Sequence, residues 1–125
     1  MREPAILLLA HGARDARWAE PFERVAGIVR RAAPERPAGI AYLEFLEPDL
    51  PTAARGLAAQ GATRIRVVPL FFGRGGHLRE SVPRVVAKTA ASMPGVSIEV
   101  ADAAGEDGAV IQAIADYCLR AVGGA

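Results

Sequence analysis

Four short apolar runs alternate with four amphipathic helical patterns along this chain of 125 residues. The runs cover residues 5–10, 39–43, 65–72 and 96–100, and apolar residues at helical spacing follow each of them. Strict alternation of strands and helices predicts a parallel sheet with helices on both faces, because every parallel pair needs a crossover. Right-handed crossovers leave few strand orders, and the simplest is the flavodoxin-like order 2-1-3-4. The sequence therefore predicts an α/β fold built on a four-stranded parallel sheet.

Local signals predict where the helices start and which side chains form the core. Pro21 stands where a first helical residue is expected, and Asp49 is a suitable N-cap for the second helix. Trp18 is expected to pack the first helix against the sheet, and Phe71 and Phe72 favour core positions unless one faces a ligand. The last helix is expected to bury an apolar stripe made by Val110, Ile111, Ile114, Ala115, Cys118 and Val122.

Length, charge and cysteine content limit the class of protein. A chain of this size fits one domain, residues 1–125. Its 15 basic and 14 acidic residues give a net charge of +1, so no overall field favours nucleic acid or an anionic membrane. Cys118 is the only cysteine, which excludes an internal disulfide and fits a reducing cytosol. Because no apolar run approaches the roughly 20 residues of a membrane span, we expect a cytoplasmic protein that binds neither nucleic acid nor membrane.

Two histidines and a carboxylate follow three neighbouring strands of the predicted sheet. His11 follows the first strand, Glu44 ends the second, and His77 lies in the loop after the third. Parallel strands lie about 4.8 Å apart, so these residues converge on the carboxyl edge, where open α/β sheets bind ligands. The set suits a divalent ion such as Zn, Co, Ni or Fe, and equally suits proton abstraction near neutral pH. The alternative is that each is an ordinary loop residue, with Glu47 a second candidate for the acid.

A glycine-rich loop delivers His77. Gly73, Gly75 and Gly76 indicate backbone at positive φ, or backbone that approaches a ligand too closely for a Cβ. The loop is no dinucleotide fingerprint, because Leu78 stands where the last glycine of G-x-G-x-x-G belongs. Arginines in the same rim loops are either partners for carboxylate or phosphate groups or ordinary solvated side chains: Arg14, Arg17, Arg74 and Arg79.

Three segments together resemble the short CbiX-type sirohydrochlorin chelatases. They are residues 8–15 with His-Gly-Ala-Arg-Asp, residues 42–48 with Leu-Glu-Phe-Leu-Glu-Pro, and residues 68–77 with Gly-Arg-Gly-Gly-His. The resemblance covers almost the whole chain in order. It implies an enzyme that inserts Co²⁺ or Fe²⁺ into sirohydrochlorin for cobalamin or sirohaem synthesis, with the metal as substrate, Ni²⁺ as a further candidate metal and no permanent cofactor. It also implies a homodimer, since these chains resemble one half of longer, two-lobed chelatases.

The resemblance also assigns residues by position. His11 and His77 match the active-site histidines of the family, and Glu44 matches the acid that joins them at the metal. This sequence departs from the family at Ala13, where serine is common, and at Ser81, where aspartate is common. Five further residues are expected to bind sirohydrochlorin, which is a flat macrocycle with carboxylates at its edge. The arginines would bind the carboxylates, the phenylalanine would lie under the ring, and the glycines would leave room for it: Arg14, Arg74, Phe71, Gly75 and Gly76.

A second interpretation stays open from the sequence. The same side chains would serve a non-catalytic protein that binds or delivers a divalent metal or a tetrapyrrole. Acceleration of metal insertion over the spontaneous rate would distinguish the enzyme from such a carrier.

Overall fold

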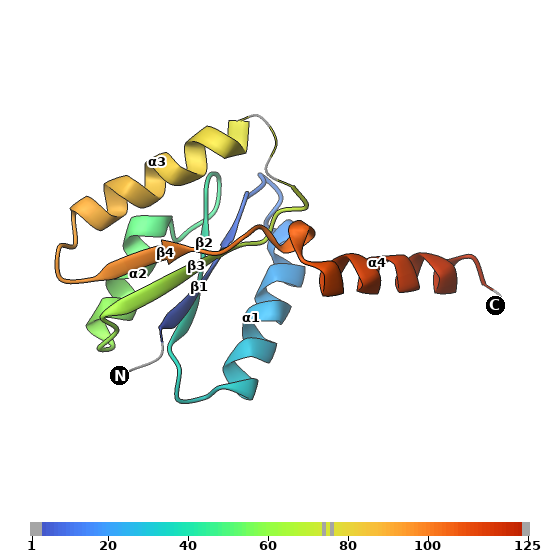
Figure 1. The fold of residues 1–125 in the computed structure, drawn as a ribbon, viewed down its shortest axis with the longest axis horizontal. Helices are drawn as coiled ribbons and strands as arrows, with labels where there is room; N and C mark the ends of the chain where they lie inside the picture. The colour runs from blue at the N-terminus through green and yellow to red at the C-terminus, as the bar shows by residue number, and fades with distance from the viewer. Residues whose placement is uncertain (1–3, 74, 76, 124–125) are drawn as a thin grey trace.

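The computed structural model describes residues 4–73, 75 and 77–123, with only the backbone of residues 77–79 (Figure 1). Four strands alternate with four helices, and two short 3-10 turns precede the first and last helix. The elements are β1 (Ala5–Ala10), η1 (Ala16–Ala19), α1 (Glu20–Ala32), β2 (Ala38–Tyr42), α2 (Leu50–Ala59), β3 (Arg64–Pro69), α3 (His77–Ala91), β4 (Ser97–Val100), η2 (Ala104–Glu106) and α4 (Gly108–Ala121).

The strands form one parallel sheet in the order β2-β1-β3-β4, which confirms the predicted fold class and strand order. Leu7 at the centre of β1 lies opposite Gly39 of β2 and Val67 of β3. The helix starts also follow the sequence signals. Pro21 lies in the first turn of α1, and the carboxylate of Asp49 accepts a 2.9 Å hydrogen bond from the backbone N–H of Thr52.

One face of the sheet carries the main hydrophobic core. Leu7, Leu9 and Val67 of the strands are fully buried there against Leu57 of α2 and Val86 of α3. This core fixes the position of α2 and α3 over the sheet, because dense apolar packing is the main stabilising contribution to such a layer.

The opposite face is covered by η1 and α1. Trp18 stacks on Phe22 with ring centroids 4.5 Å apart and also contacts Tyr42 of β2, as expected from the sequence. Farther along this face, Arg66 of β3 forms a 3.3 Å ion pair with Glu99 of β4, and both side chains are about half exposed. The β3–β4 part of this face is therefore open to solvent.

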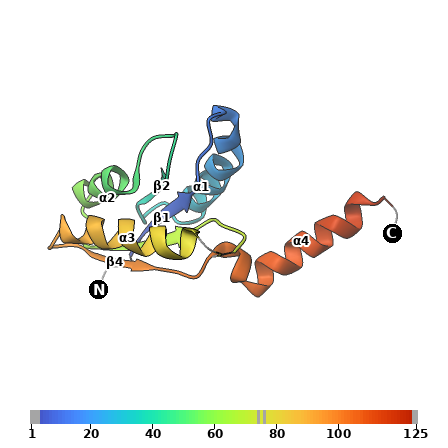
Figure 2. The ribbon, with the colours of Figure 1, turned by 90° about the horizontal axis from the view of Figure 1, so that it is seen from above.

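Two expectations about the core are wrong. Phe72 is 71% exposed, because β3 ends at Pro69 and the chain turns away from the sheet before residue 72. The apolar stripe of α4 is not buried, and Cys118 is exposed. The cause is the direction of α4, which extends away from the sheet and from the other three helices in both views (Figures 1 and 2). None of the described helices is both long enough and apolar enough to span a bilayer.

Tyr42 supplies a testable feature of the α1 side. Its side chain is 3% exposed, and among the described residues its hydroxyl has no hydrogen-bond partner. Burial raises the pKa of Tyr42 above its ordinary value of 10.0, and the nearby charge of Glu23 adds to the increase. A buried hydroxyl without a partner costs about 1–3 kcal/mol.

We therefore expect Tyr42→Phe to raise the free energy of unfolding at pH 7 by about 1 kcal/mol. Above pH 10 the unfolded wild-type chain loses the phenol proton while the folded chain keeps it, so wild-type stability falls with rising pH. The variant should lack this part of the decline. Urea unfolding at pH 7 and pH 10.5 measures both effects, with Tyr117→Phe, at an exposed position, as the control. A destabilised Tyr42→Phe variant would show that the hydroxyl is hydrogen-bonded.

Candidate functional site

His11 and Glu44 form a hydrogen-bonded pair beyond the carboxyl ends of β1 and β2. Nε2 of His11 lies 2.7 Å from Oε2 of Glu44. The two side chains are 39% and 48% exposed, so a solute can reach both. An imidazole that donates Nε2–H to the carboxylate keeps the lone pair of Nδ1, and an imidazolium is stabilised by the same carboxylate. The pair can therefore hold either a proton or a cation.

Backbone contacts between the ends of β1 and β2 position this pair. The backbone N–H groups of Leu43 and Glu44 both donate to the carbonyl oxygen of His11, at 3.1 and 3.0 Å. Gly12 has φ at +103° and lies directly against the same turn. A Cβ at residue 12 would lie 1.8 Å from the carbonyl oxygen of Glu44. Only glycine allows this approach and this backbone conformation, so Gly12 holds the His11 and Glu44 segments in contact.

The turn after Glu44 brings Phe45 to the same rim. Phe45 has φ at +68°, which is unusual for a bulky residue, and its ring is 56% exposed. The guanidinium of Arg14 lies 4.8 Å from the centre of this ring. Among the described residues, no carboxylate pairs with Arg14. The contact with the ring positions the guanidinium and does not neutralise its charge, so the group can still bind an anion.

A hollow of about 180 Å³ adjoins the His11–Glu44 pair. Leu43 lines it from the β2 side, while Ser81 and Val85 line it from α3. Ser81 and Val85 are four residues apart and so lie on one face of the helix. His77 is the first residue of α3 and precedes Ser81 by four residues, which places it in the same row of helical positions. The side chain of His77 lies outside the described part of the structure.

The glycine loop is described only in part. Gly73 does not have the positive φ that the density of glycines suggested, and a Cβ at Gly73 or Gly75 would meet no atom within 4 Å among the described residues. No steric reason inside the described part of the chain therefore requires glycine at these two positions. Arg74 and Gly76 lie outside the described residues.

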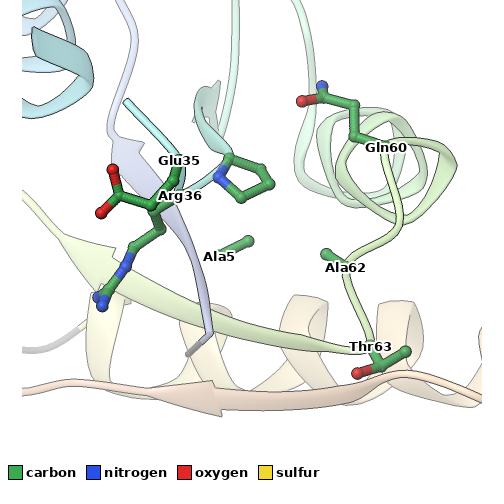
Figure 3. A pocket seen from close by; sticks show the side chains of 7 residues that line it. Ala5, Glu35, Arg36, Gln60, Ala62 and Thr63 are labelled. Carbon is green, nitrogen blue, oxygen red and sulfur yellow. The ribbon is translucent and has the colours of Figure 1, made fainter. Parts of the chain in front are cut away.

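Phe71 is not among the residues that line the hollow beside the His11–Glu44 pair. It is 7% exposed, belongs to the main core cluster and also lines an apolar groove together with Phe22, Val25 and Leu70. A further hollow of about 370 Å³ lies at the amino ends of the strands, where Ala5, Glu35 and Gln60 line it (Figure 3). Because Ala5 and Ala10 are opposite ends of β1, this hollow is at the far end of the sheet from His11.

Some residues of the site had no clear signal in the sequence. Ser81 could have been placed beside the histidines, because it lies one helical turn after His77. Leu43 and Phe45 could not, since nothing in the sequence indicates the positive φ of Phe45. Among the described side chains, no group of three His, Cys, Asp or Glu residues is arranged to hold a metal ion, and the pair of His11 and Glu44 is the part of the predicted set that the structure brings together.

The fold built on the parallel four-stranded sheet is shared with solved structures of a CbiX protein and of the sirohydrochlorin chelatase SirB. A crystal structure of a cobalamin-biosynthesis CbiX protein from Marinobacter aquaeolei VT8 matches with a TM-score of 0.85 and 38% identity, over 96% of this chain and 98% of that one. Sirohydrochlorin chelatase SirB from Bacillus subtilis matches with TM-scores of 0.83, in a structure with Fe³⁺, and 0.77, in a complex with cobalt. The SirB identities are 26% and 28% over 99% and 95% of this chain, which spans only 49% and 51% of the SirB chains.

Sequence relatives agree with the structural matches. The sirohydrochlorin cobaltochelatase of Sulfurisphaera tokodaii is 30% identical over 102 residues, which are 82% of this chain and 80% of that protein. The CbiX family itself matches residues 5–121. The chain belongs to the CbiX family.

Proposed function

We propose that this protein is a chelatase that inserts a divalent metal ion, Co²⁺ or Fe²⁺, into sirohydrochlorin. The carrying observation is the 2.7 Å pair of His11 and Glu44 at the carboxyl edge of the sheet, within a chain of the CbiX family. The sirohydrochlorin cobaltochelatase among its relatives, and the SirB structures with cobalt and with Fe³⁺, support the substrate and both metals. The product would serve cobalamin or sirohaem synthesis.

The chemistry of metal insertion matches what the pair can do. Two pyrrole N–H protons must leave the macrocycle, and the incoming ion must lose water. Neutral His11 can accept one proton at a ring nitrogen, and the carboxylate of Glu44 then stabilises the imidazolium at 2.7 Å. The same imidazole and carboxylate are suitable ligands for a borderline divalent ion, and the negative charge of Glu44 strengthens that binding. The metal is a substrate in this scheme, with no permanent cofactor.

His77 completes the proposed metal set. Its backbone position at the start of α3, one turn before Ser81, lies along the helix row that lines the hollow beside His11. In this proposal His11, Glu44 and His77 receive the metal, Gly75 and Gly76 give room for a flat macrocycle, and Arg74 binds its carboxylates. The hydroxyl of Ser81 takes the place where relatives of the family commonly carry an aspartate.

Arg14 is proposed to bind a carboxylate at the edge of the macrocycle. Its guanidinium is exposed, stacked on Phe45 and without a carboxylate partner among the described residues. Arg14→Glu should raise KM for sirohydrochlorin roughly ten-fold with little change in kcat, because the lost contact binds substrate and transition state equally. Arg31→Glu is the matched control, since Arg31 is exposed in the last turn of α1, at the other end of the sheet. An unchanged KM in Arg14→Glu would contradict this role.

The chelatase proposal has a direct optical test. Sirohydrochlorin is incubated with Co²⁺, Fe²⁺ or Ni²⁺, with and without the protein, and the absorbance of the metallated product is followed. The expected result is insertion faster than the spontaneous rate, with turnover beyond one product per protein. Binding of metal or macrocycle without acceleration would instead identify a carrier or delivery protein.

The same proposal includes a homodimer as the assembly and the cytoplasm as the location. Residues 1–125 are proposed to act as one domain, and two copies to work together, because this chain spans about half the length of SirB. The lone cysteine fits the reducing conditions of the cytoplasm.

A further inference from the structure

The turn after Glu44 holds a phenylalanine in a backbone conformation that is unfavourable for it. The N–H of Leu46 donates a 2.8 Å hydrogen bond to the carbonyl oxygen of Glu44, two residues earlier, and Phe45 between them has φ at +68°. Such a bond around a residue with positive φ is the rarer, strained form of the γ-turn. Glycine adopts this φ without a clash, whereas a bulky residue does not. Strain of this kind clusters at sites that bind ligands.

Packing in the core does not explain why residue 45 is a phenylalanine. Phe45 is 56% exposed and belongs to neither core cluster of the described residues, whereas the next side chain, Leu46, packs on the smaller cluster. The turn is anchored by its backbone, because the N–H groups of Leu43 and Glu44 both donate to the carbonyl oxygen of His11. The chain can therefore keep this turn without an aromatic side chain at residue 45, and the function of the ring lies outside the turn.

The ring contacts the guanidinium of Arg14, whose Cζ lies 4.8 Å from the ring centre. Arg17, three residues later in the same loop, shows the alternative: its guanidinium donates to both carboxylate oxygens of Asp15, at 3.1 and 2.8 Å. That ion pair occupies donors of Arg17 and offsets its charge. An aromatic face instead restricts the motion of a guanidinium and leaves its N–H donors and its charge to an anion. Of these two arginines, Arg14 is therefore the one available to a carboxylate.

Two side-chain contacts join the segment after β1 to the segment after β2. His11 and Glu44 form the first contact, with 2.7 Å between Nε2 and Oε2. Arg14, three residues after His11, and Phe45, directly after Glu44, form the second. The first contact is the proposed metal and proton site, and the second places a positive charge at the same edge of the sheet. A macrocycle bound with its nitrogens at His11 carries its carboxylates at the periphery, where this charge can meet one of them.

We infer that Phe45 is a positioning residue for substrate binding: its ring fixes the guanidinium of Arg14 in the place where a carboxylate at the edge of the macrocycle binds. The inference rests on the proposed function for the identity of that macrocycle. Fixing the arginine before the substrate arrives removes part of the side-chain entropy that binding otherwise costs. Loss of the ring should therefore weaken binding of the macrocycle and leave the metal and proton chemistry of His11 and Glu44 intact.

The first test compares three substitutions at residue 45 by titration with metal-free sirohydrochlorin. Phe45→Leu should raise the Kd about five-fold, as expected for loss of an exposed cation–π contact, and Phe45→Tyr, which keeps the ring, should stay within about two-fold of the wild type. Phe45→Gly should bind as weakly as Phe45→Leu yet unfold at a higher temperature than Phe45→Leu, because glycine relieves the strain. An unchanged Kd in Phe45→Leu, or a Phe45→Tyr variant that binds equally weakly, would overturn the inference.

The second test asks whether the ring acts through Arg14. In an Arg14→Ala background, Phe45→Leu should cause no further loss of affinity, because the group that the ring positions is gone. Losses that add would overturn the inference. Calorimetric titration of Phe45→Leu with Co²⁺ alone should match the wild type, and a lower Co²⁺ affinity would show that the ring acts through Glu44 instead. Tyr117→Leu is the matched control with an unchanged Kd, since it removes another exposed ring under an arginine, Arg120, at 5.9 Å.

Failure of this inference is distinct from failure of the proposed function, because binding of the metal-free macrocycle requires no metal insertion. Metal insertion by the wild type, together with an unchanged Kd in Phe45→Leu, would contradict the inference alone. Binding that depends on Arg14 and Phe45, without accelerated insertion, would support the inference and contradict the chelatase proposal. A wild type that does not bind sirohydrochlorin would contradict both. Circular dichroism checks that each variant folds.

Discussion

His11→Ala is expected to lower kcat/KM for metal insertion at least about 100-fold, while the fold persists. A positioned acid–base group contributes about 10²–10⁴-fold to a proton transfer, and this substitution also removes an imidazole that is proposed to hold the metal. The side chain of His11 is 39% exposed, so thermal unfolding should change little. Initial rates of sirohydrochlorin metallation at fixed Co²⁺ measure the first effect, and calorimetric titration with Co²⁺ alone measures the loss of metal binding.

The neighbouring acids give a matched control for this prediction. Glu44→Gln keeps an oxygen that can accept from His11 but removes the charge 2.7 Å from Nε2, so we expect a roughly ten-fold loss of kcat/KM. Glu47→Gln makes the same chemical change at an exposed residue three positions away and should leave the rate unchanged. If His11→Ala retains the wild-type rate, or if Glu47→Gln is the more damaging change, the assignment of the pair is wrong.

The fold was predictable because local and tertiary patterns agree. Continuous apolar strands such as residues 5–10 occur where both faces of a sheet are covered, and Asp49 marks a helix start by its own hydrogen bond. Strand order then followed from the handedness of crossovers, and it brought His11 next to Glu44 although 33 residues separate them.

The remaining features depend on contacts that periodicity cannot describe. The stripe around Cys118 predicts a buried helix, but periodicity does not say against which surface, and in the described part of the chain α4 has no buried residue. Phe72 is an apolar residue that the pattern predicts to be buried, but it is exposed because β3 ends three residues earlier. The stacking of Arg14 on Phe45 depends on a positive φ that no residue preference predicts for phenylalanine.

Gly12→Ala is expected to destabilise the protein by roughly 3 kcal/mol and to disrupt the site at the same time. The new Cβ would lie 1.8 Å from the carbonyl oxygen of Glu44, and backbone with φ at +103° is strained for any residue with a side chain. The turn that carries Glu44 must therefore move, so the 2.7 Å contact with His11 should be lost.

Gly56→Ala tests whether the Gly12 effect is specific to its position. Gly56 lies inside α2, and a methyl group added there would meet no atom of the described residues within 4 Å, so alanine should stabilise the helix by about 0.5–1 kcal/mol. Opposite signs are thus expected for one chemical change at two glycines. Thermal unfolding should show a decrease of about 10 °C for Gly12→Ala and a small increase for Gly56→Ala, with a loss of Co²⁺ affinity in the first variant alone. Unchanged stability and metal affinity in Gly12→Ala would mean that the close approach of residues 12 and 44 does not hold the site together.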